Sequence, residues 1–242
     1  ATFDISALPE DQYLAFEAVF SDNQDNSLLR GQSVFYSLSR VSGLQIPIFV
    51  GRVNETSRPS GLLPTSRVNP LAAVVARSFL ISAGGDDVQD ASYASVDSAE
   101  MTGFDLTTWQ TMTMRDKLPI VPKSLGMLLD RYAVLIDGDS AGLFDFVTYQ
   151  ALYPKSPSEF AFDSVSSGDS VSGENGESYV VGPTRPGLPS SRVMLFDTDL
   201  TIHQFDLGFE RTSASAAWVS SFGVLVVGGS SSAPAIEILA PF

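Results

Sequence analysis

The segment SLGMLLDRYAVLIDG at residues 124–138, followed by FDFVTYQ at 144–150, indicates the fold. The run Tyr132–Ile136 has the length of a strand and is bounded by turn-forming residues. Phe144–Leu152 is aromatic and β-branched rather than rich in Ala, Glu or Lys, so it favours a strand over a helix. The segment Leu118–Leu129 contains two prolines and a glycine, which also disfavours a helix. These residues predict consecutive short strands.

Runs of the same kind extend in both directions from this segment. They have strand length and lie between clusters of Gly, Ser, Asp and Pro: Tyr13–Phe20, Ser33–Leu38, Leu44–Val50, Leu71–Ile81, Arg192–Phe196 and Gly223–Val227. The polar stretches 54–67 and 163–178 read as long solvated loops. Because the strand signals have the same character on both sides of each loop, we expect a single all-β domain over 1–242, almost free of helix.

Composition and charge exclude several classes of protein. Apolar residues make up 44% of the 242 residues, which is enough for a folded core. With 14 basic against 28 acidic residues, the formal charge of −14 disfavours nucleic acids and anionic membrane surfaces as partners. No apolar run approaches the roughly 20 residues that cross a bilayer, so we expect no membrane insertion. The chain begins at Ala1 without a signal-peptide pattern, and a mature extracellular form trimmed from a precursor stays open.

Metal ligands are scarce in the sequence. Without cysteine and with one histidine, His203, a zinc or copper site is disfavoured, and we expect no cofactor. Carboxylates cluster in three places, where calcium binding stays an open alternative to solvated turns. The clusters are Asp86, Asp87 and Asp90; Asp22 and Asp25 with Asn23 and Asn26; and Asp137 with Asp139. A pair of acids for glycoside hydrolysis also stays open, because separation in space is not readable from the sequence.

Internal repetition is the most informative pattern. Five apolar runs end in glycine, at intervals of 33 to 54 residues: Gly51, Gly84, Gly138, Gly182 and Gly228. Three of these runs are followed by a phenylalanine–aspartate pair: Phe104-Asp105, Phe144-Asp145 and Phe196-Asp197. After the first pair, Trp109 follows in an aromatic strand. This pattern resembles kelch repeats, best over 67–115 and 209–242.

The resemblance implies a β-propeller of about five kelch-like blades. The last unit ends after its third strand, at AIEILAPF (235–242), and ATFDISALP (1–9) has strand character. We therefore expect the two termini to pair in one sheet and to close the ring. A jelly-roll β-sandwich, as in viral coats and some lectins, is the alternative fold, with about eight strands and no 45-residue period.

A match to the nucleophile elbow of serine esterases occurs at GDSAG, residues 138–142. Ser140 would be the nucleophile and His203 the base, with Asp163 or Asp169 as its orienting group. The residues that follow favour a strand instead of the required helix, and no oxyanion segment precedes the match. We therefore interpret this segment as a turn and Ser140 as no nucleophile.

The sequence predicts a non-catalytic binding or scaffold module that presents loops to a protein or glycan partner. A jelly-roll structural subunit of an assembly such as a viral capsid, with self-assembly, is the first alternative. A serine esterase using Ser140 and His203 is the second.

Overall fold

The computed structural model describes residues 12–37, 39, 45–56, 67–88, 95–97, 99–113, 118–152, 160–183, 188–229 and 236–240. In these residues the chain forms 23 strands and one short 3₁₀ helix, η3 (Phe162–Val165). The predicted all-β class and the near absence of helix are confirmed for this part of the chain. The described strands form seven antiparallel sheets of two to four strands, rather than the two packed sheets of a jelly roll.

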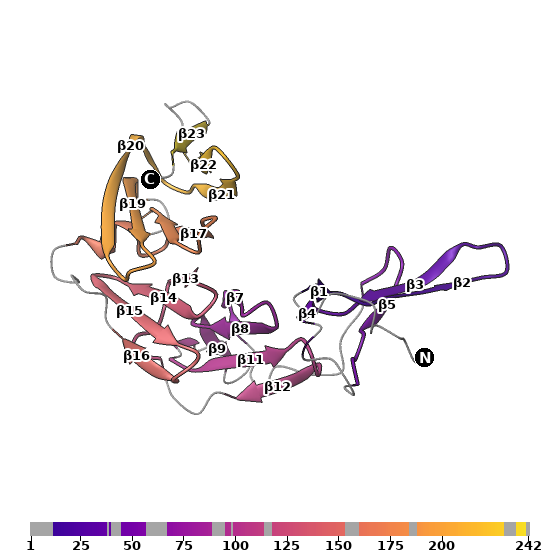
Figure 1. The fold of residues 1–242 in the computed structure, drawn as a ribbon. Coiled ribbons are helices and arrows are strands. Elements are labelled where there is room, and N and C mark those ends of the chain that lie inside the picture. The colour runs from indigo at the N-terminus through magenta and orange to yellow at the C-terminus, as the bar shows by residue number, and fades with distance from the viewer. Residues whose placement is uncertain are drawn as a thin grey trace.

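Four of these sheets form the main body of the molecule and lie in a curved row (Figure 1). The first sheet contains β7 (Leu71–Val75), β8 (Phe79–Ala83), β11 (Met101–Asp105) and β12 (Gln110–Thr113). The second contains β13 (Ser124–Leu128), β14 (Tyr132–Asp137), β15 (Ser140–Asp145) and β16 (Gln150–Leu152). The third contains β17 (Asp169–Ser172), β18 (Ser178–Val181), β19 (Ser190–Phe196) and β20 (Ile202–Arg211). The fourth contains β21 (Ser215–Val219), β22 (Gly223–Val227) and β23 (Ile236–Leu239).

Successive sheets contact each other through their first strands, β7 with β13, β13 with β17, and β17 with β21. Between β13 and β17, serine hydroxyls join the strands: Ser170 Oγ donates to the carbonyl of Leu125 at 2.6 Å, and Ser172 Oγ to that of Met127 at 3.1 Å. Gly126 in β13 leaves room for Ser178 of β18, since a Cβ there would lie 2.4 Å from Ser178 Oγ. The first strands therefore line one side of the row.

Buried apolar side chains fill the spaces between neighbouring sheets. One cluster, which includes Ile81, Met101 and Leu135, lies between the first and second sheets. A second cluster lies between the second and third sheets, and a third between the third and fourth. Side chains on each sheet alternate between the two spaces, so both faces of the second and third sheets are buried.

The sequence repeat has a fixed place in this architecture. The glycine-ended runs are the second strands of the four sheets, β8, β14, β18 and β22. The phenylalanine–aspartate pairs lie where the third strands of the first three sheets, β11, β15 and β19, end. The remaining glycine, Gly51, lies within β5 (Val50–Arg52).

Several expected features differ from the structure. Of the run Leu44–Val50, residues 45–49 form no strand, Tyr13–Phe20 is interrupted between β1 and β2, and Phe144–Leu152 is interrupted by the turn after β15. The run Leu71–Ile81 is not one strand, because a hairpin turn at Ala76 and Arg77 separates β7 from β8. Both turn residues have positive φ, 48° and 55°, without the Asn or Gly that usually marks such turns. The expected loop 163–178 overlaps η3 and contains strand β17, and Val165 in η3 is fully buried. Serine-rich composition concealed this strand, whose hydroxyls bond to β13.

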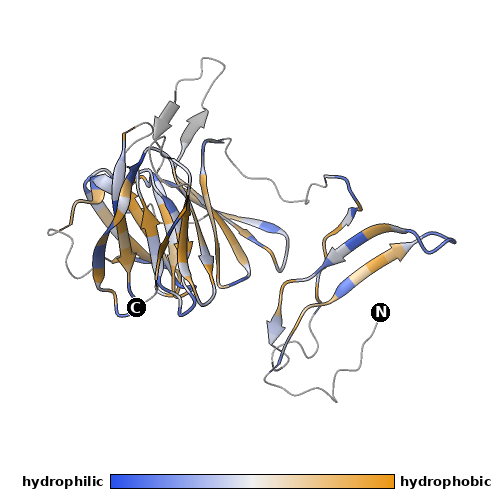
Figure 2. Cartoon of the chain, turned by 90° about the horizontal axis from the view of Figure 1, so that it is seen from above, coloured by the Kyte–Doolittle hydropathy of each residue, from blue (hydrophilic) through white to orange (hydrophobic). Residues whose placement is uncertain are grey.

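The remaining strands lie at the amino-terminal side. Strands β2 (Glu17–Ser21), β3 (Ser27–Gln32) and β5 form one sheet, and β1 (Tyr13–Leu14) pairs with β4 (Tyr36–Ser37). Both views place β1–β5 away from the row of four sheets (Figures 1 and 2). Strands β6 (Arg67–Val68), β9 (Asp86–Val88) and β10 (Ser95–Asp97) form a further small sheet. Residues 1–11 lie outside the described part, so the expected pairing of the termini stays a prediction.

Candidate functional site

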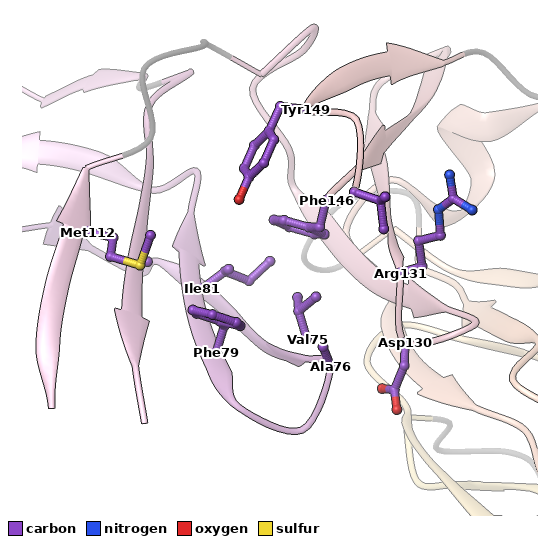
Figure 3. Close-up of a pocket in the computed structure, with 11 residues that line it drawn as sticks. Val75, Ala76, Phe79, Ile81, Met112, Asp130, Arg131, Phe146 and Tyr149 are labelled. Atoms are coloured by element: carbon purple, nitrogen blue, oxygen red, sulfur yellow. The ribbon is translucent and has the colours of Figure 1, made fainter. Parts of the chain in front are cut away.

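A pocket of about 140 Å³ opens between the first and second sheets (Figure 3). Its walls come from β7, β8, β11 and β12 of the first sheet and from two turns of the second sheet. The lining residues are Val75, Ala76, Phe79, Ile81, Gly103, Met112, Asp130, Arg131, Phe146, Val147 and Tyr149. Most of these side chains are apolar, so the pocket offers dispersion and hydrophobic contact more than hydrogen bonds.

The pocket exists because Gly103 has no side chain. Counting back from the aspartate that ends each third strand, Gly103 in the first sheet corresponds to Leu143 in the second and Leu195 in the third. Leu143 is fully buried between the second and third sheets, and Leu195 is 3% exposed between the third and fourth. Gly103 therefore leaves open a space that leucine occupies in the next two sheets.

The turn after β15 supplies Tyr149 to the pocket and is built around Asp145. The carboxylate of Asp145 accepts hydrogen bonds from the Val147 amide at 2.8 Å and the Thr148 hydroxyl at 2.9 Å. The Tyr149 amide donates to the Asp145 carbonyl at 2.8 Å. Tyr149 has φ 56° and its side chain is half exposed, pointing into the pocket in Figure 3. The side chain is thus presented by a rigid turn.

The same turn occurs one sheet earlier. The carboxylate of Asp105 accepts bonds from the Thr107 amide at 2.7 Å and the Thr108 hydroxyl at 2.9 Å. Trp109 takes the position of Tyr149, with φ 59° and a 2.8 Å bond from its amide to the Asp105 carbonyl. Its ring contacts that of Phe49, with centroids 5.0 Å apart. This position therefore places an aromatic ring against a segment distant in sequence.

The charged residues of the pocket form ion pairs with residues outside its lining. The Arg131 guanidinium binds Asp145 through two hydrogen bonds of 2.9 and 2.6 Å, and in Figure 3 it points away from the space. These hydrogen bonds hold the pKa of the buried Asp145 carboxyl well below its usual range. Asp130 lies 3.5 Å from the guanidinium of Arg77. The pocket thus has paired charges at its rim and an apolar interior.

The GDSAG segment is a hairpin turn. Gly138 and Asp139 connect β14 to β15, and Gly138 has φ 55°. Ser140 is the exposed first residue of β15, and its hydroxyl donates to Asp139 Oδ1 at 3.3 Å. A strand follows this serine, whereas a nucleophile elbow leads into a helix.

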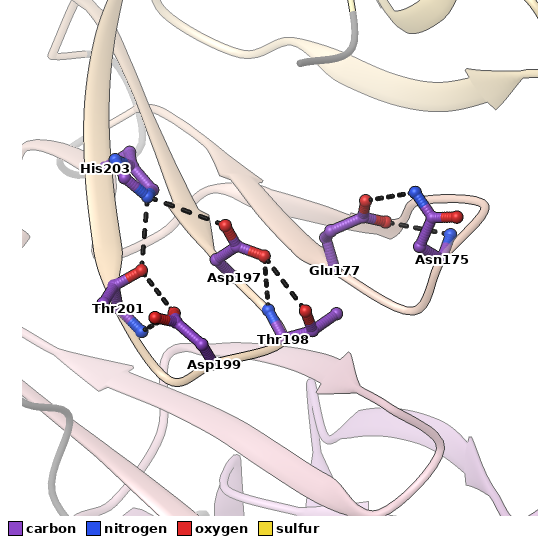
Figure 4. Close-up of polar contacts among 7 residues, drawn as sticks. All are labelled: Asn175, Glu177, Asp197, Thr198, Asp199, Thr201 and His203. Carbon is purple, nitrogen blue, oxygen red and sulfur yellow. Dashed lines mark hydrogen bonds and ion pairs between the residues drawn. The ribbon is translucent and has the colours of Figure 1, made fainter.

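His203 lies on β20 in the third sheet and takes part in a polar surface cluster (Figure 4). Its Nε2 is 3.2 Å from Thr201 Oγ1 and 3.7 Å from Asp197 Oδ2. Among the described residues no hydrogen bond joins His203 to Ser140, which belongs to the second sheet. The structure does not bring the two esterase candidates together.

The two candidate orienting acids of that esterase have other roles. Asp163 lies in η3, and its carbonyl accepts a hydrogen bond from the Ser166 amide. Asp169 Oδ2 accepts a 2.9 Å bond from the Ala216 amide and so links the third sheet to the fourth. Within the part of the chain described, neither carboxylate bonds to His203.

The carboxylate clusters are mostly turn structures. The Asp22 carboxylate accepts hydrogen bonds from the Asn26 side chain and from the backbone amides of Gln24 and Asn26 within the β2–β3 turn. These bonds lower the pKa of Asp22, and the bond from the Asn26 side chain has the largest effect. Asp137 lies 3.4 Å from Lys123 Nζ. Asp86 and Asp87 form part of β9, and Asp90 lies outside the described residues. No group of three potential ligands that could hold a metal occurs in the described ranges.

Sequence reasoning missed the pocket. The signal was present, because aligning the three phenylalanine–aspartate pairs places Gly103 against two leucines. This alignment predicts a pocket only when the position of Gly103 is known to face the neighbouring sheet.

Comparisons with known proteins bear on the fold. No protein-family model matches the sequence, and no curated protein matches it. Among solved structures 149 chains match. One is the structure of YjhT, at 12% sequence identity and a TM-score of 0.51, covering 94% of this chain and 77% of the other. At this low identity, the likeness to YjhT is one of fold alone.

In the described residues no helix has the length and apolarity needed to span a membrane.

Proposed function

We propose that this chain is a non-catalytic binding module, built as a β-propeller of the kelch type, that holds a protein partner at the pocket between its first two sheets. The four sheets would be blades, and the first strands β7, β13, β17 and β21 would line the propeller axis. Three features support this reading: the contacts between successive first strands, the glycines after the second strands, and the Asp-centred turns.

The observation that carries the binding function is the open apolar space at Gly103. Filling such a space stabilises a fold, and the chain fills the corresponding space with Leu143 and Leu195. A site kept open at the expense of stability fits a binding role better than a packing role. A protein partner fits better than a glycan, because Arg131 and Asp130 at the pocket already pair with Asp145 and Arg77.

Peptide display tests this function. A random peptide library selected on the whole chain should yield peptides whose binding is lost in Gly103→Leu. Binding should persist in Phe222→Ser, which alters an exposed apolar residue in the turn between β21 and β22 of the fourth sheet. Selected peptides that bind Gly103→Leu as well as the unchanged protein would place the binding surface elsewhere.

A further inference from the structure

The lining of the pocket narrows the kind of group it takes. Three aromatic rings, those of Phe79, Phe146 and Tyr149, border the space from different sides, with Met112 opposite them (Figure 3). Phe146 is held in place by an edge contact with Phe144, whose centroid lies 5.2 Å away. Aromatic rings and thioether sulfur both favour a further aromatic ring over an aliphatic group of the same size.

The size of the pocket agrees with one ring. Its volume of about 140 Å³ is close to that of an engineered apolar cavity of about 150 Å³ that stays dry and binds benzene. A leucine side chain supplied by the chain itself occupies the corresponding place in the second and third sheets. The missing group is therefore apolar and of the size of a single side chain.

The chain contains its own precedent for such a contact. Trp109 and Tyr149 hold the same position in equivalent turns, with φ 59° and 56°. Trp109 receives the ring of Phe49 from a segment outside its own sheet. No corresponding ring packs on Tyr149 in the described residues, where the pocket lies instead.

We propose that the pocket binds an aromatic side chain of a protein partner, and that basic residues flank this aromatic residue in the partner's sequence. This inference rests on the proposed function. The pocket is open at its rim, where Val147 is 68% and Tyr149 51% exposed, so a polypeptide can lie across it while one ring enters. The net charge of −14 attracts a basic segment and repels an acidic one.

The test uses four nine-residue peptides and toluene as probes, titrated into the whole protein. One peptide carries a central phenylalanine between glycines and lysines; the others replace phenylalanine with leucine, replace it with alanine, or replace the lysines with glutamates. Binding is read from the NMR signals of the Ile81, Val75 and Met112 methyl groups. We expect the phenylalanine peptide to bind about two- to tenfold more tightly than the leucine peptide. The alanine and glutamate peptides should bind more weakly still, and Gly103→Leu should lose binding.

Each other result overturns a distinct part of the proposal. Equal affinity of the leucine and phenylalanine peptides would remove the aromatic preference and leave the proposed function intact. Equal affinity of the lysine and glutamate peptides would contradict the preference for basic residues beside the aromatic ring. Binding of toluene without binding of any peptide would assign the pocket to small free aromatic molecules. Absence of any shift at the methyl groups of these three residues would overturn both this inference and the pocket's role in the proposed function.

Discussion

Replacing Gly103 with leucine should raise the stability of the fold. A Cβ at this position would lie 3.7 Å from both Cβ and the carbonyl oxygen of Met112, which is ordinary contact. Removing a glycine from a strand gains roughly 0.5–1 kcal/mol, and filling a cavity commonly gains about 0.5–2 kcal/mol. A closed cavity of about 140 Å³ would cost about 3 kcal/mol at about 24 cal/mol per Å³. Because this pocket is open, we expect a total gain of roughly 1–3 kcal/mol.

Thermal unfolding measures this gain. For a domain of this size each kcal/mol moves the midpoint by about 2–4 °C, so Gly103→Leu should melt about 2–12 °C higher. The matched control is Gly126→Leu, the same change in another buried strand. There a Cβ would lie 2.4 Å from Ser178 Oγ, so this variant should melt lower than the unchanged protein. A Gly103→Leu protein that melts lower than the unchanged one would refute the reasoning about the unfilled leucine position.

Three further predictions concern single side chains. Glu237→Gln should destabilise the chain by about 3–5 kcal/mol in urea unfolding, because it removes the negative charge that binds the Arg211 guanidinium, which is 1% exposed and lies 2.6 Å from Glu237 Oε2. A loss below about 1 kcal/mol would contradict this role. The lowered pKa of Asp145, caused first by the hydrogen bonds from Arg131, contributes stability above the unfolded pKa near 3.9 that is lost as the pH falls toward the folded pKa. Asp145→Asn should therefore lower the free energy of unfolding at pH 7 and flatten its fall below about pH 4, and an unchanged acid limb would oppose this assignment. A fluorophosphonate probe should not label Ser140, and labelling that Ser140→Ala abolishes would restore the esterase alternative.

The sequence allowed the strand class to be predicted, and the glycines and aspartates that follow its strands have local physical causes. Gly84 follows β8 with φ 62°, and a side chain there would meet the Pro122 carbonyl at 2.4 Å. Asp105 and Asp145 end their strands because each carboxylate caps the turn that follows. Because these turns require glycine and aspartate, the recurring Gly and Asp positions can be recognised in the amino-acid sequence.

Other features depend on tertiary contacts and leave no local signal. The hairpin turn at Leu129 and Asp130 has positive φ at both residues, which is rare for a leucine. Hydrogen bonds to both neighbouring sheets hold this turn. The Asp130 carbonyl accepts from the Ala76 amide of the first sheet, and the Leu129 amide donates to the Gly176 carbonyl of the third. The pocket arises in the same way, from the relation of Gly103 to a neighbouring sheet.

A disulfide between β13 and β17 tests the contact between successive first strands. A Cβ at Gly126 in β13 would lie 3.5 Å from the Ser170 Cβ in β17, within the range of about 3.5–4.5 Å that a disulfide needs. The chain has no cysteine to compete. Ser178→Ala removes the hydroxyl that would meet the new side chain, and that hydroxyl has no hydrogen-bond partner among the described residues.

The measurement is the yield of the intramolecular disulfide in Gly126→Cys/Ser170→Cys/Ser178→Ala after mild oxidation of the folded protein. The control pair, Ser140→Cys with Phe222→Cys, lies on the second and fourth sheets, which are not neighbours. We expect nearly complete formation of the first disulfide in the native protein, little in urea, and little for the control pair. A yield for the first pair no higher than that of the control would contradict the side-by-side arrangement of the sheets.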